Sequence, residues 1–531
     1  MDIVFRDALV VDGTGAPARR ADVGVAEGRI ASISTERLTG RRVIDAADMV
    51  LSPGFIDMHS HSDLRLLVEP DHLAKVSQGV TLEVLGQDGL SYAPVDDDVL
   101  AQLRTQLAGW NGDPPDFDWD WRTVGEYLDR LDRGIAVNAA YLVPQGTLRM
   151  LCVGWESRPP TPDELDRMRR ILAESLQQGA VGMSSGLTYT PGMYADTDEL
   201  VALCEVVAEH GGYYCPHHRS YGAGALEAYA EMIEVSRRSG CPLHLAHATM
   251  NFPVNAGRAG ELLAMVDAAI DAGCDITLDS YPYLPGATYL SALLPSWVTE
   301  GGLEKALVRL TDPEIRERIR VELEETGSDG CHGVPVDWST IEINGVRREA
   351  NTHLVGRTVA ESARRAGVPP SQLYFDVLVD ERLGTSCLMH VGHEENVRTI
   401  MRHRAHTGGS DGLLVGERPH PRAWGTFPRY LARYVRELGV LGLEECIAHL
   451  TGRAAARLRL VDRGLIREGY AADLVLFDPE SITDTATFDN PRSPATGIRH
   501  VLVNGVVVLD EGRPTGALPG RALRRSREGT R

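Results

Sequence analysis

The segment Gly54-Phe-Ile-Asp-Met-His-Ser-His61 decides the fold and points to the chemistry. Alternate residues of an extended chain face the same way, so His59 and His61 can reach one metal ion. They directly follow an apolar run from Val50 to Met58, which is typical of a buried strand. Barrels of the (β/α)8 type carry their catalytic groups at the carboxyl ends of their strands. The sequence therefore predicts a metal site at one end of a barrel.

Seven further strand-like runs alternate with helical stretches, such as residues 161–178. The runs begin at Val80, Val137, Val181, Gly212, Pro242, Cys274 and Thr407. Alternating strands and helices favour a parallel sheet covered by helices. In a chain of 531 residues, eight such units predict an α/β protein with a (β/α)8 TIM-type barrel.

Both ends of the chain consist of short strands with alternating apolar residues, and Asn504-Gly505 is a strong hairpin signal. We expect the two ends to form one small β-sandwich. A charged region punctuated by glycine and proline interrupts the barrel pattern and predicts an inserted subdomain, while the polar, basic tail is expected to be disordered. The expected parts are residues 1–50 and 456–520 for the sandwich, 51–455 for the barrel with an insertion near 300–350, and 521–531 for the tail.

Composition narrows the class of partner. A net charge of -21 disfavours nucleic acid and acidic membranes, and no apolar run approaches the roughly 18 residues of a membrane span. The segment Met1-Asp-Ile-Val-Phe-Arg has no basic stretch followed by an apolar one, so a cytoplasmic location is expected. The eight cysteines form no CxxC pair, which argues against a disulfide framework. An oligomer remains compatible with these features.

Three more polar residues close strand-like runs. His217 and His247 end the fifth and sixth runs, and Asp411, within Gly408-Gly-Ser-Asp-Gly, ends the eighth. Parallel strands of a barrel all end on the same face, so these side chains are expected beside His59 and His61. A buried structural aspartate is the alternative for Asp411.

These motifs resemble the amidohydrolase superfamily, and more specifically its N-acyl-D-amino-acid deacylases, or D-aminoacylases. The resemblance includes Ser185-Gly-Leu-Thr-Tyr, His217-His-Arg-Ser and His420-Pro-Arg-Ala-Trp-Gly-Thr-Phe, and it covers nearly the whole chain. It implies a metal-dependent barrel enzyme that cleaves the amide of a small N-acylated amino acid.

The resemblance also implies a set of metal ligands for one or two Zn²⁺ ions. A tightly held ion would use a bridging residue after the second strand with His217 and His247, and a weaker position would use His59, His61 and Asp411.

The bridging residue departs from the family pattern. Where the family has Gly-Asn-Cys-Gly, this chain has Gly86-Gln-Asp88-Gly, so Asp88 replaces the cysteine. A carboxylate can bind or bridge zinc but is a harder ligand than a thiolate, which allows another divalent metal. The alternative is that Asp88-Gly89 forms only a turn.

The lysines exclude a different metal bridge. Other superfamily members bridge two metals with a carboxylated lysine on the fourth strand. Lysine occurs here only at Lys75 and Lys305, and none lies near Gly182-Met-Ser-Ser. Hydantoinase-type and dihydroorotase-type sites are therefore disfavoured.

Four more histidines could in principle be metal ligands. His218 lies beside His217 and should point to the opposite side of an extended chain, although it is the alternative ligand at this strand end. His244 lies three residues before His247 and should also face away. No role is assigned to His390 or His393.

The mechanism that follows is attack by a metal-activated hydroxide on the amide carbon. Asp411 would act as the general base and then return the proton to the leaving nitrogen. Resemblance assigns the substrate α-carboxylate to Arg422, with Arg219 helping, and a substrate hydrogen bond to Tyr189, for which a packing role is the alternative. Many relatives have a lysine where this chain has Thr249, so carboxylate binding must differ in detail.

The expected products are neutral, hydrophobic D-amino acids. The resemblance implies that a cation for an acidic side chain would lie in the segment after Tyr281-Pro-Tyr, and between residues 275 and 308 only Lys305 is positively charged. The preference for D over L also rests on resemblance. A related amidohydrolase acting on D-dipeptides, lactams or carbamates is the alternative. A non-catalytic binding barrel is the contrasting class, and the complete set of candidate ligands argues against it.

Overall fold

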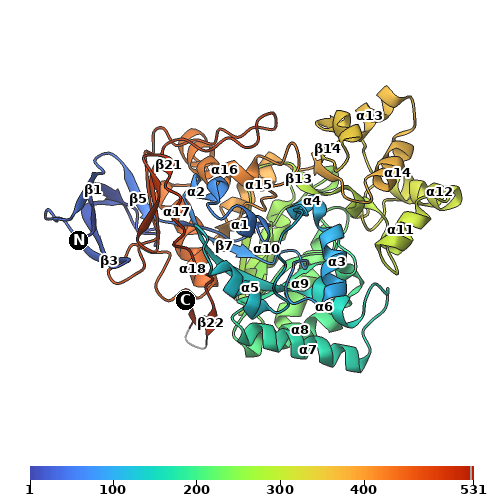
Figure 1. Ribbon diagram of the computed structural model, residues 1–531, viewed down its shortest axis with the longest axis horizontal. Coiled ribbons are helices and arrows are strands. Elements are labelled where there is room, and N and C mark those ends of the chain that lie inside the picture. Colours follow the sequence, from blue (N-terminus) through green and yellow to red (C-terminus); the bar gives the residue numbers. More distant parts are fainter. Residues whose placement is uncertain (527–528) are drawn as a thin grey trace.

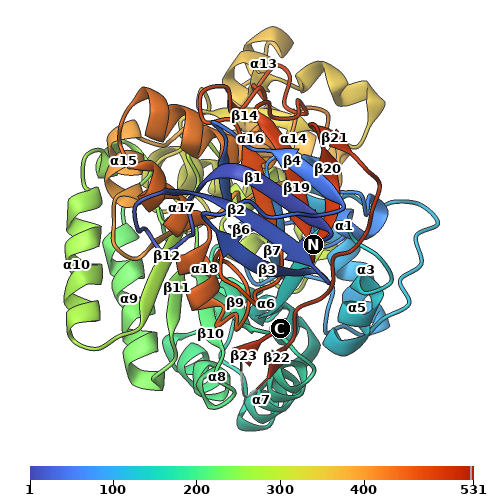
Figure 2. The same ribbon diagram turned by 90° about the vertical axis from the view of Figure 1, so that its left-hand side faces the viewer.

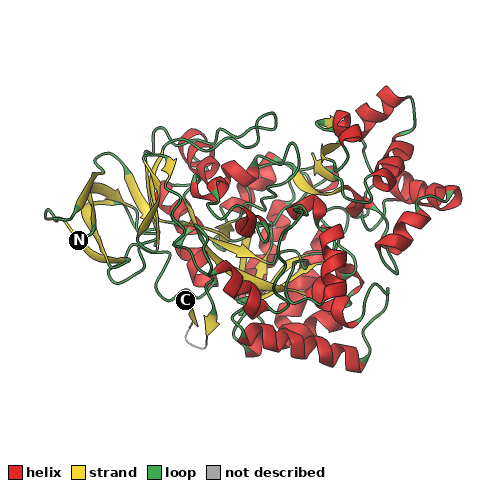
Figure 3. Cartoon of the chain, in the orientation of Figure 1, coloured by secondary structure: helices red, strands yellow, loops and turns green. Residues whose placement is uncertain are grey.

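A computed structural model describes residues 1–526 and 529–531. A β-rich part lies at one end, a strand-and-helix barrel lies in the middle, and a smaller, mainly helical part lies at the other end (Figures 1 and 3). In the described part of the chain, no helix is both long enough and apolar enough to cross a membrane.

The central part is a parallel barrel. Its eight strands pair in the order β17-β12-β11-β10-β9-β8-β7-β6. The ring closes where the Met58 amide donates to the Gly408 carbonyl at 3.1 Å and Ser60 pairs with Gly412. The strands are β6 (Phe55–Asp57), β7 (Val80–Leu85), β8 (Asn138–Pro144), β9 (Gly182–Gly186), β10 (Tyr213–His217), β11 (Leu243–Leu245), β12 (Ile276–Ser280) and β17 (His406–Gly408). All eight predicted strands are present, and the predicted TIM-type barrel is confirmed.

Helices follow most barrel strands. The predicted helix at 161–178 is α7, which begins at a capping box between Thr161 and Glu164. The helices of this part are α1 (Arg65–Val68), α2 (Leu73–Val76), α3 (Asp97–Gln106), α4 (Ala108–Asn111), α5 (Val124–Leu131), α6 (Gln145–Cys152), α7 (Pro162–Gln177), α8 (Thr197–Glu209), α9 (Ala225–Ser239), α10 (Ala259–Asp271), α15 (Glu394–Met401), α16 (Arg422–Arg429), α17 (Leu443–Leu450) and α18 (Gly452–Arg457).

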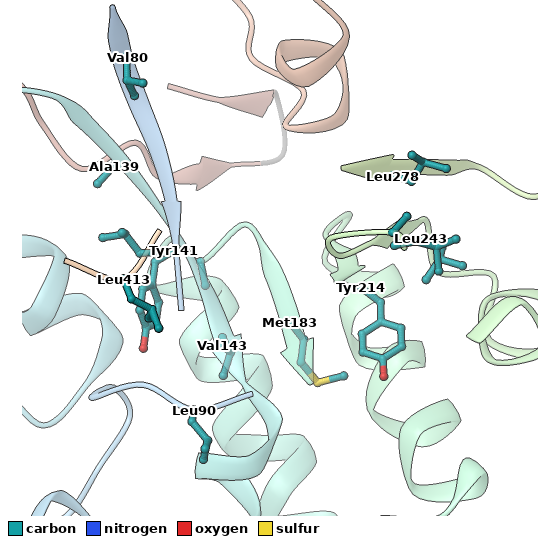
Figure 4. Close-up of a cluster of buried hydrophobic side chains, with 14 of the residues drawn as sticks. Val80, Leu90, Ala139, Tyr141, Val143, Met183, Tyr214, Leu243, Leu278 and Leu413 are labelled. Carbon is teal, nitrogen blue, oxygen red and sulfur yellow. The ribbon is translucent and has the colours of Figure 1, made fainter. Parts of the chain in front are cut away.

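The main hydrophobic core includes side chains from the barrel strands. Val143, Met183, Tyr214 and Leu243 come from four consecutive strands and are fully buried (Figure 4). Burial of one such side chain stabilises the fold by about 1.5–3 kcal/mol. The barrel is therefore a rigid frame for the loops at its strand ends.

The two ends of the chain join in one nine-stranded sheet (Figure 2). The junction is the antiparallel pair of β5 and β18, so N-terminal and C-terminal strands lie side by side, as predicted. Its strands are β1 (Ile3–Val10), β2 (Arg19–Ala26), β3 (Arg29–Ser34), β4 (Arg42–Asp45), β5 (Val50–Pro53), β18 (Leu474–Phe477), β19 (Ile498–Val503), β20 (Val506–Asp510) and β21 (Arg513–Pro514).

The predicted first strand is divided between two sheets. β5 belongs to the terminal sheet and β6 to the barrel, and Gly54 lies between them. A Cβ atom at Gly54 would lie 2.1 Å from Thr81 Oγ1 on β7, so only glycine fits here. This glycine lets the chain pass from the terminal sheet into the barrel immediately before the two histidines.

The inserted subdomain is larger than predicted. It contains a four-stranded sheet, four helices and a hydrophobic core of its own. The predicted limits near 300–350 miss the strands β13 and β16, because these are short segments that pair with each other across about a hundred residues. The elements are β13 (Gly286–Tyr289), α11 (Leu303–Arg309), α12 (Pro313–Val321), β14 (Ile341–Gly345), β15 (Arg357–Thr358), α13 (Val359–Ala366), α14 (Pro370–Asp380) and β16 (Ser386–Met389).

The described part of the tail is ordered, which corrects the expectation of a disordered segment at 521–531. Leu523 is fully buried, and its amide donates to the Ala139 carbonyl at 2.7 Å. Arg524 pairs with Asp132 at 2.6 Å, and β22 (Arg525–Ser526) pairs with β23 (Gly529–Thr530). The basic residues that suggested disorder instead make specific contacts with the barrel.

Candidate metal centre

The barrel brings all six predicted ligands together at one end. Each lies at or just beyond the carboxyl end of its strand, where parallel strands present their loops to one face. The residues and their strands are His59 and His61 after β6, Asp88 after β7, His217 at the end of β10, His247 after β11 and Asp411 after β17.

The ligands form two groups that share Asp88. One consists of His59, His61, Asp88 and Asp411, and the other of Asp88, His217 and His247. Within each group the candidate ligand atoms lie within 4.8 Å of one another. Asp88 is thus the one residue that the two groups share, at the position where the family pattern has a cysteine.

Each oxygen of Asp88 faces one histidine of each group. Oδ1 lies 3.4 Å from His59 Nε2 and 3.5 Å from His247 Nε2. Oδ2 lies 3.4 Å from His61 Nε2 and 3.5 Å from His217 Nδ1. A carboxylate in this position can provide one oxygen to each of two ions.

Buried atoms without a hydrogen-bond partner show that these residues fit a metal ion. His59 Nε2 and Asp88 Oδ1 are buried and make no hydrogen bond. Buried polar atoms are normally paired, so two such atoms facing each other call for another partner. Imidazole nitrogens with carboxylate oxygens are a donor set that suits zinc and related divalent metals.

Three of the ligands have an unusual backbone. Asp88, His247 and Asp411 have φ angles of 55°, 30° and 47°, in the left-handed region that L residues seldom occupy. Such residues store strain and are concentrated at functional sites. The fold therefore holds these side chains in positions that the local chain does not favour.

The electrostatics favour the metal-binding forms of His217 and Asp88. Burial alone would lower the pKa values of His59 and His61, but Asp88 with Asp279 or Asp411 outweighs it and raises both. Burial lowers the pKa of His217 to about 4, so its imidazole is neutral at neutral pH. Burial alone would raise the pKa of Asp88, but His59, His247 and His217 outweigh it and hold that pKa well below its usual range. Asp88 is therefore an ionised carboxylate among imidazoles.

The loop that carries Asp88 is tied to the fourth strand of the barrel. Ser184 on β9 donates to the Gly86 carbonyl at 2.5 Å and accepts a hydrogen bond from the Gly89 amide at 3.0 Å. Gly86 has a φ of 73°, and a Cβ atom there would lie 2.1 Å from the Leu142 carbonyl oxygen. A serine thus supports the bridging loop from the strand that carries the bridging lysine in other superfamily members.

Three supporting residues escaped the sequence analysis. Thr188 Oγ1 lies 2.6 Å from His217 Nε2, and the Tyr221 hydroxyl lies 3.1 Å from His247 Nδ1. Asp279, at the end of β12, accepts a hydrogen bond from the His247 amide at 3.0 Å. Contacts of this kind orient metal ligands and fix their tautomers. A signal existed for Asp279, since it closes the seventh strand-like run just as the ligands close theirs.

The other histidines lie outside both ligand groups. His218 packs between Tyr221 and Tyr229, and His244 pairs with Asp279 at 3.0 Å, and neither belongs to a ligand group. His390 lies 2.9 Å from Glu342, and His393 Nε2 lies 2.8 Å from the Phe252 carbonyl oxygen.

A cavity opens beside the metal ligands. Its walls include Tyr189, whose hydroxyl lies 3.0 Å from Thr288 Oγ1, and residues of the inserted subdomain. His332 from that subdomain also lines it, and burial lowers the pKa of His332 to about 3. Sequence reasoning missed His332 because it lies in the inserted subdomain and closes no barrel strand. Further lining residues are Trp110, Tyr281, Leu293, Met389, Val391 and Leu413.

Arg422 is buried behind this cavity. Its Nη2 lies 2.8 Å from Asp411 Oδ2, and its guanidinium lies 4.5 Å from the centre of the Tyr281 ring. It contacts two residues that line the cavity without lining it itself.

Arg219 makes its hydrogen bonds within the protein. Its guanidinium donates to Glu231 at 2.8 Å and to the carbonyls of Met193 and Ala195. These contacts direct the guanidinium away from the ligands, and Arg219 does not line the cavity. These contacts tie Arg219 to neighbouring loops, which does not favour the predicted role in substrate binding.

Four buried imidazoles and two carboxylates at the carboxyl end of a parallel barrel define a metal-dependent hydrolase of the (β/α)8 class. Residues 42–509 match the model of the amidohydrolase family, and the chain belongs to that family.

The similar proteins agree with this assignment. The chain is 35% identical to an N-acyl-D-glutamate deacylase of Alcaligenes xylosoxydans xylosoxydans, over 99% of this chain and 97% of that protein. A D-aminoacylase structure described for its binuclear metal centre superposes with a TM-score of 0.83 at 34% identity, covering 99% of this chain and 100% of that one. An N-acyl-D-glutamate deacylase of Bordetella bronchiseptica, complexed with zinc and a phosphonate inhibitor, gives 0.84 at 33% identity, with 99% of each chain covered.

Proposed function

We propose that this protein hydrolyses the amide bond of N-acyl-D-amino acids, releasing a carboxylate and a free D-amino acid. The observation that carries the proposal is the pair of ligand groups joined by Asp88 beside a cavity. Similar proteins named as N-acyl-D-amino-acid deacylases support the substrate class.

The metal is proposed to be zinc, as one or two ions. Asp88, His217 and His247 would hold one ion, and His59, His61, Asp88 and Asp411 would hold the other. A bound divalent ion lowers the pKa of water and polarises a carbonyl oxygen. The harder carboxylate at Asp88 also admits other divalent metals.

Asp411 is proposed as the general base and acid. Its Oδ1 lies 3.1 Å from His61 Nε2, and its Oδ2 faces Arg422. Burial alone would raise the pKa of Asp411, but Arg422 and the nearby histidines lower it below its usual range. The carboxylate is thus ionised and ready to accept a proton, which it can then pass to the leaving nitrogen.

Arg422 and Tyr189 are proposed to position the substrate. Tyr189 lines the cavity, and its ring centre lies 4.7 Å from that of His217. Arg422 is the cation nearest to Asp411, and two of its nitrogens, Nε and Nη1, are buried without a hydrogen-bond partner. A guanidinium with free donors suits the substrate α-carboxylate. Asp411 and Tyr281 lie between Arg422 and the cavity, so the carboxylate would bind next to these two residues.

The side chain of the substrate is proposed to be neutral and hydrophobic. Among the described residues, no lysine or arginine lines the cavity. Its walls include Leu293, Met389 and Val391, which favour an apolar group. An acidic side chain would lose its hydration there without gaining a cation.

The test is a panel of substrates given to the zinc-loaded protein. The N-acetyl derivatives of D-leucine, D-methionine and D-phenylalanine are expected to have higher kcat/KM values than those of D-glutamate and D-aspartate. Faster cleavage of the acidic substrates would contradict the proposed side-chain preference. Preference for a D-dipeptide, lactam or carbamate in the same panel would contradict the substrate class.

A further inference from the structure

A buried network of charges lies beside the ligands His59, His61 and Asp411, and the proposed mechanism does not use it. At its centre is Lys75 on α2, whose side chain is fully buried. A buried ammonium is costly unless it is paired and hydrogen-bonded. Lysine occurs only twice in this chain, and the other, Lys305, lies exposed in the inserted subdomain.

The Lys75 ammonium has three close partners. Its Nζ lies 2.5 Å from Asp57 Oδ2, 2.8 Å from Ser410 Oγ and 3.1 Å from Glu83 Oε1. A lysine ammonium has three N–H donors, so these partners match its capacity. The partners come from β6, the loop after β17 and β7, and the ammonium therefore links the three segments around the closure of the barrel.

Asp57 connects Lys75 to the backbone near the ligands His59 and Asp411. Its Oδ1 accepts hydrogen bonds from the His59 amide at 3.2 Å and from the Ser410 amide at 2.8 Å. Ser410 directly precedes Asp411. The backbone at both ligands is thus fixed by one carboxylate that Lys75 neutralises.

Glu83 connects Lys75 to the two residues on either side of His61. Its Oε1 accepts hydrogen bonds from Ser60 Oγ at 2.6 Å and from Ser62 Oγ at 2.9 Å, the two residues that flank His61. Its Oε2 lies 2.6 Å from His72 Nε2. The His-Ser-His segment is therefore held by two carboxylates that share one ammonium.

The other ligand group has different support. His217 contacts Thr188 and His247 contacts Tyr221, and no contact joins Lys75 to either histidine or to either supporting residue. The two metal positions share Asp88 and also Asp279, which lies 3.7 Å from His59 Nδ1 and accepts a hydrogen bond from the His247 amide. The contacts of Lys75, in contrast, are with the segments that carry His59, His61 and Asp411.

We propose that Lys75 is a positioning residue that pre-orders the metal position formed by His59, His61 and Asp411. When the hydrogen bonds of Lys75 are disrupted, metal binding at that position weakens by about 10- to 100-fold, as is common for residues that support metal ligands. The position formed by His217 and His247 keeps its affinity. The proposal rests on the metal site of the proposed function but not on its substrate.

The experiment measures Co²⁺ affinity by calorimetry and by visible absorption in two backgrounds. His217→Gln leaves the position that Lys75 supports, and His61→Gln leaves the other one. Lys75→Arg keeps the charge but replaces a compact donor with a larger, planar one. We expect it to weaken Co²⁺ binding by about 10- to 100-fold in the first background and by less than threefold in the second.

Two further variants make the result decisive. Ser410→Ala removes one Lys75 contact without changing any charge, and it should show the same selectivity if Lys75→Arg does not fold. Lys305→Met is the matched lysine control and should change neither affinity. Equal losses in both backgrounds, or no loss in either, would overturn the proposal. Because the assay measures binding, inactivity toward N-acyl-D-amino acids would leave it standing.

Discussion

The substitution Asp88→Asn separates a bridging metal ligand from a simple turn residue. Asparagine keeps the volume of aspartate and tolerates the left-handed φ of 55° found at this position, so a turn would survive. It removes a charge that faces four imidazoles at 3.4–3.5 Å.

The size of the effect follows from this geometry. Removing one partner from a buried charge cluster costs about 3–5 kcal/mol. Since about 1.36 kcal/mol corresponds to a factor of ten, the affinity for a divalent ion should fall by at least about 100-fold. Both positions should weaken, because Asp88 belongs to both ligand groups.

The assay combines metal content, measured by mass spectrometry after dialysis against buffered zinc, with calorimetric titration. Asp116→Asn is a matched control, since Asp116 is exposed and has a φ of 61° but lies in neither ligand group. Unchanged zinc content and affinity in Asp88→Asn would refute the bridging role and leave Asp88-Gly89 as a turn.

Three further predictions concern catalysis, support and folding. Asp411→Asn should lower kcat by about 10²- to 10⁴-fold in steady-state assays with substrate, and full activity would contradict its role as base. Thr188→Val removes the contact with His217 and should lower zinc affinity by about 10- to 100-fold in calorimetry, while Thr188→Ser should restore it; equal affinities in the two variants would contradict this. Gly54→Ala places a Cβ atom 2.1 Å from Thr81 Oγ1 and should lower the free energy of unfolding in urea by about 1–3 kcal/mol, which an unchanged midpoint would disprove.

The barrel could be predicted because its signals are local. Each strand is a short apolar run, and each candidate ligand closes one of these runs, so its position in the chain fixes its place on the barrel face. Neighbouring residues of a strand point to opposite sides, so His217 and His218 could not both be ligands, and the resemblance to the family selects His217.

Features that depend on distant contacts could not be predicted. The strands β13 and β16 pair across a long insertion, and the basic tail is held by acceptors on the barrel. Arg219 lies in a family motif, yet Glu231 on α9 uses its guanidinium. His332 reaches the cavity only because the inserted subdomain folds back over it.

Lys75 illustrates both what the sequence can predict and what it cannot. The sequence reveals that it is one of two lysines, which excludes a lysine bridge on the fourth strand. Its partners Asp57, Glu83 and Ser410 lie on separate segments, and only the closed barrel brings them together.

The central claim is that a divalent metal in this barrel cleaves N-acyl-D-amino acids. The most direct measurement compares kcat/KM for N-acetyl-D-methionine and N-acetyl-L-methionine before chelation, after chelation and after zinc is restored. We predict that the D-enantiomer is cleaved much faster, that chelation abolishes this activity and that zinc restores it. Cleavage of the L-enantiomer alone, or undiminished cleavage of the D-enantiomer after complete metal removal, would contradict the account.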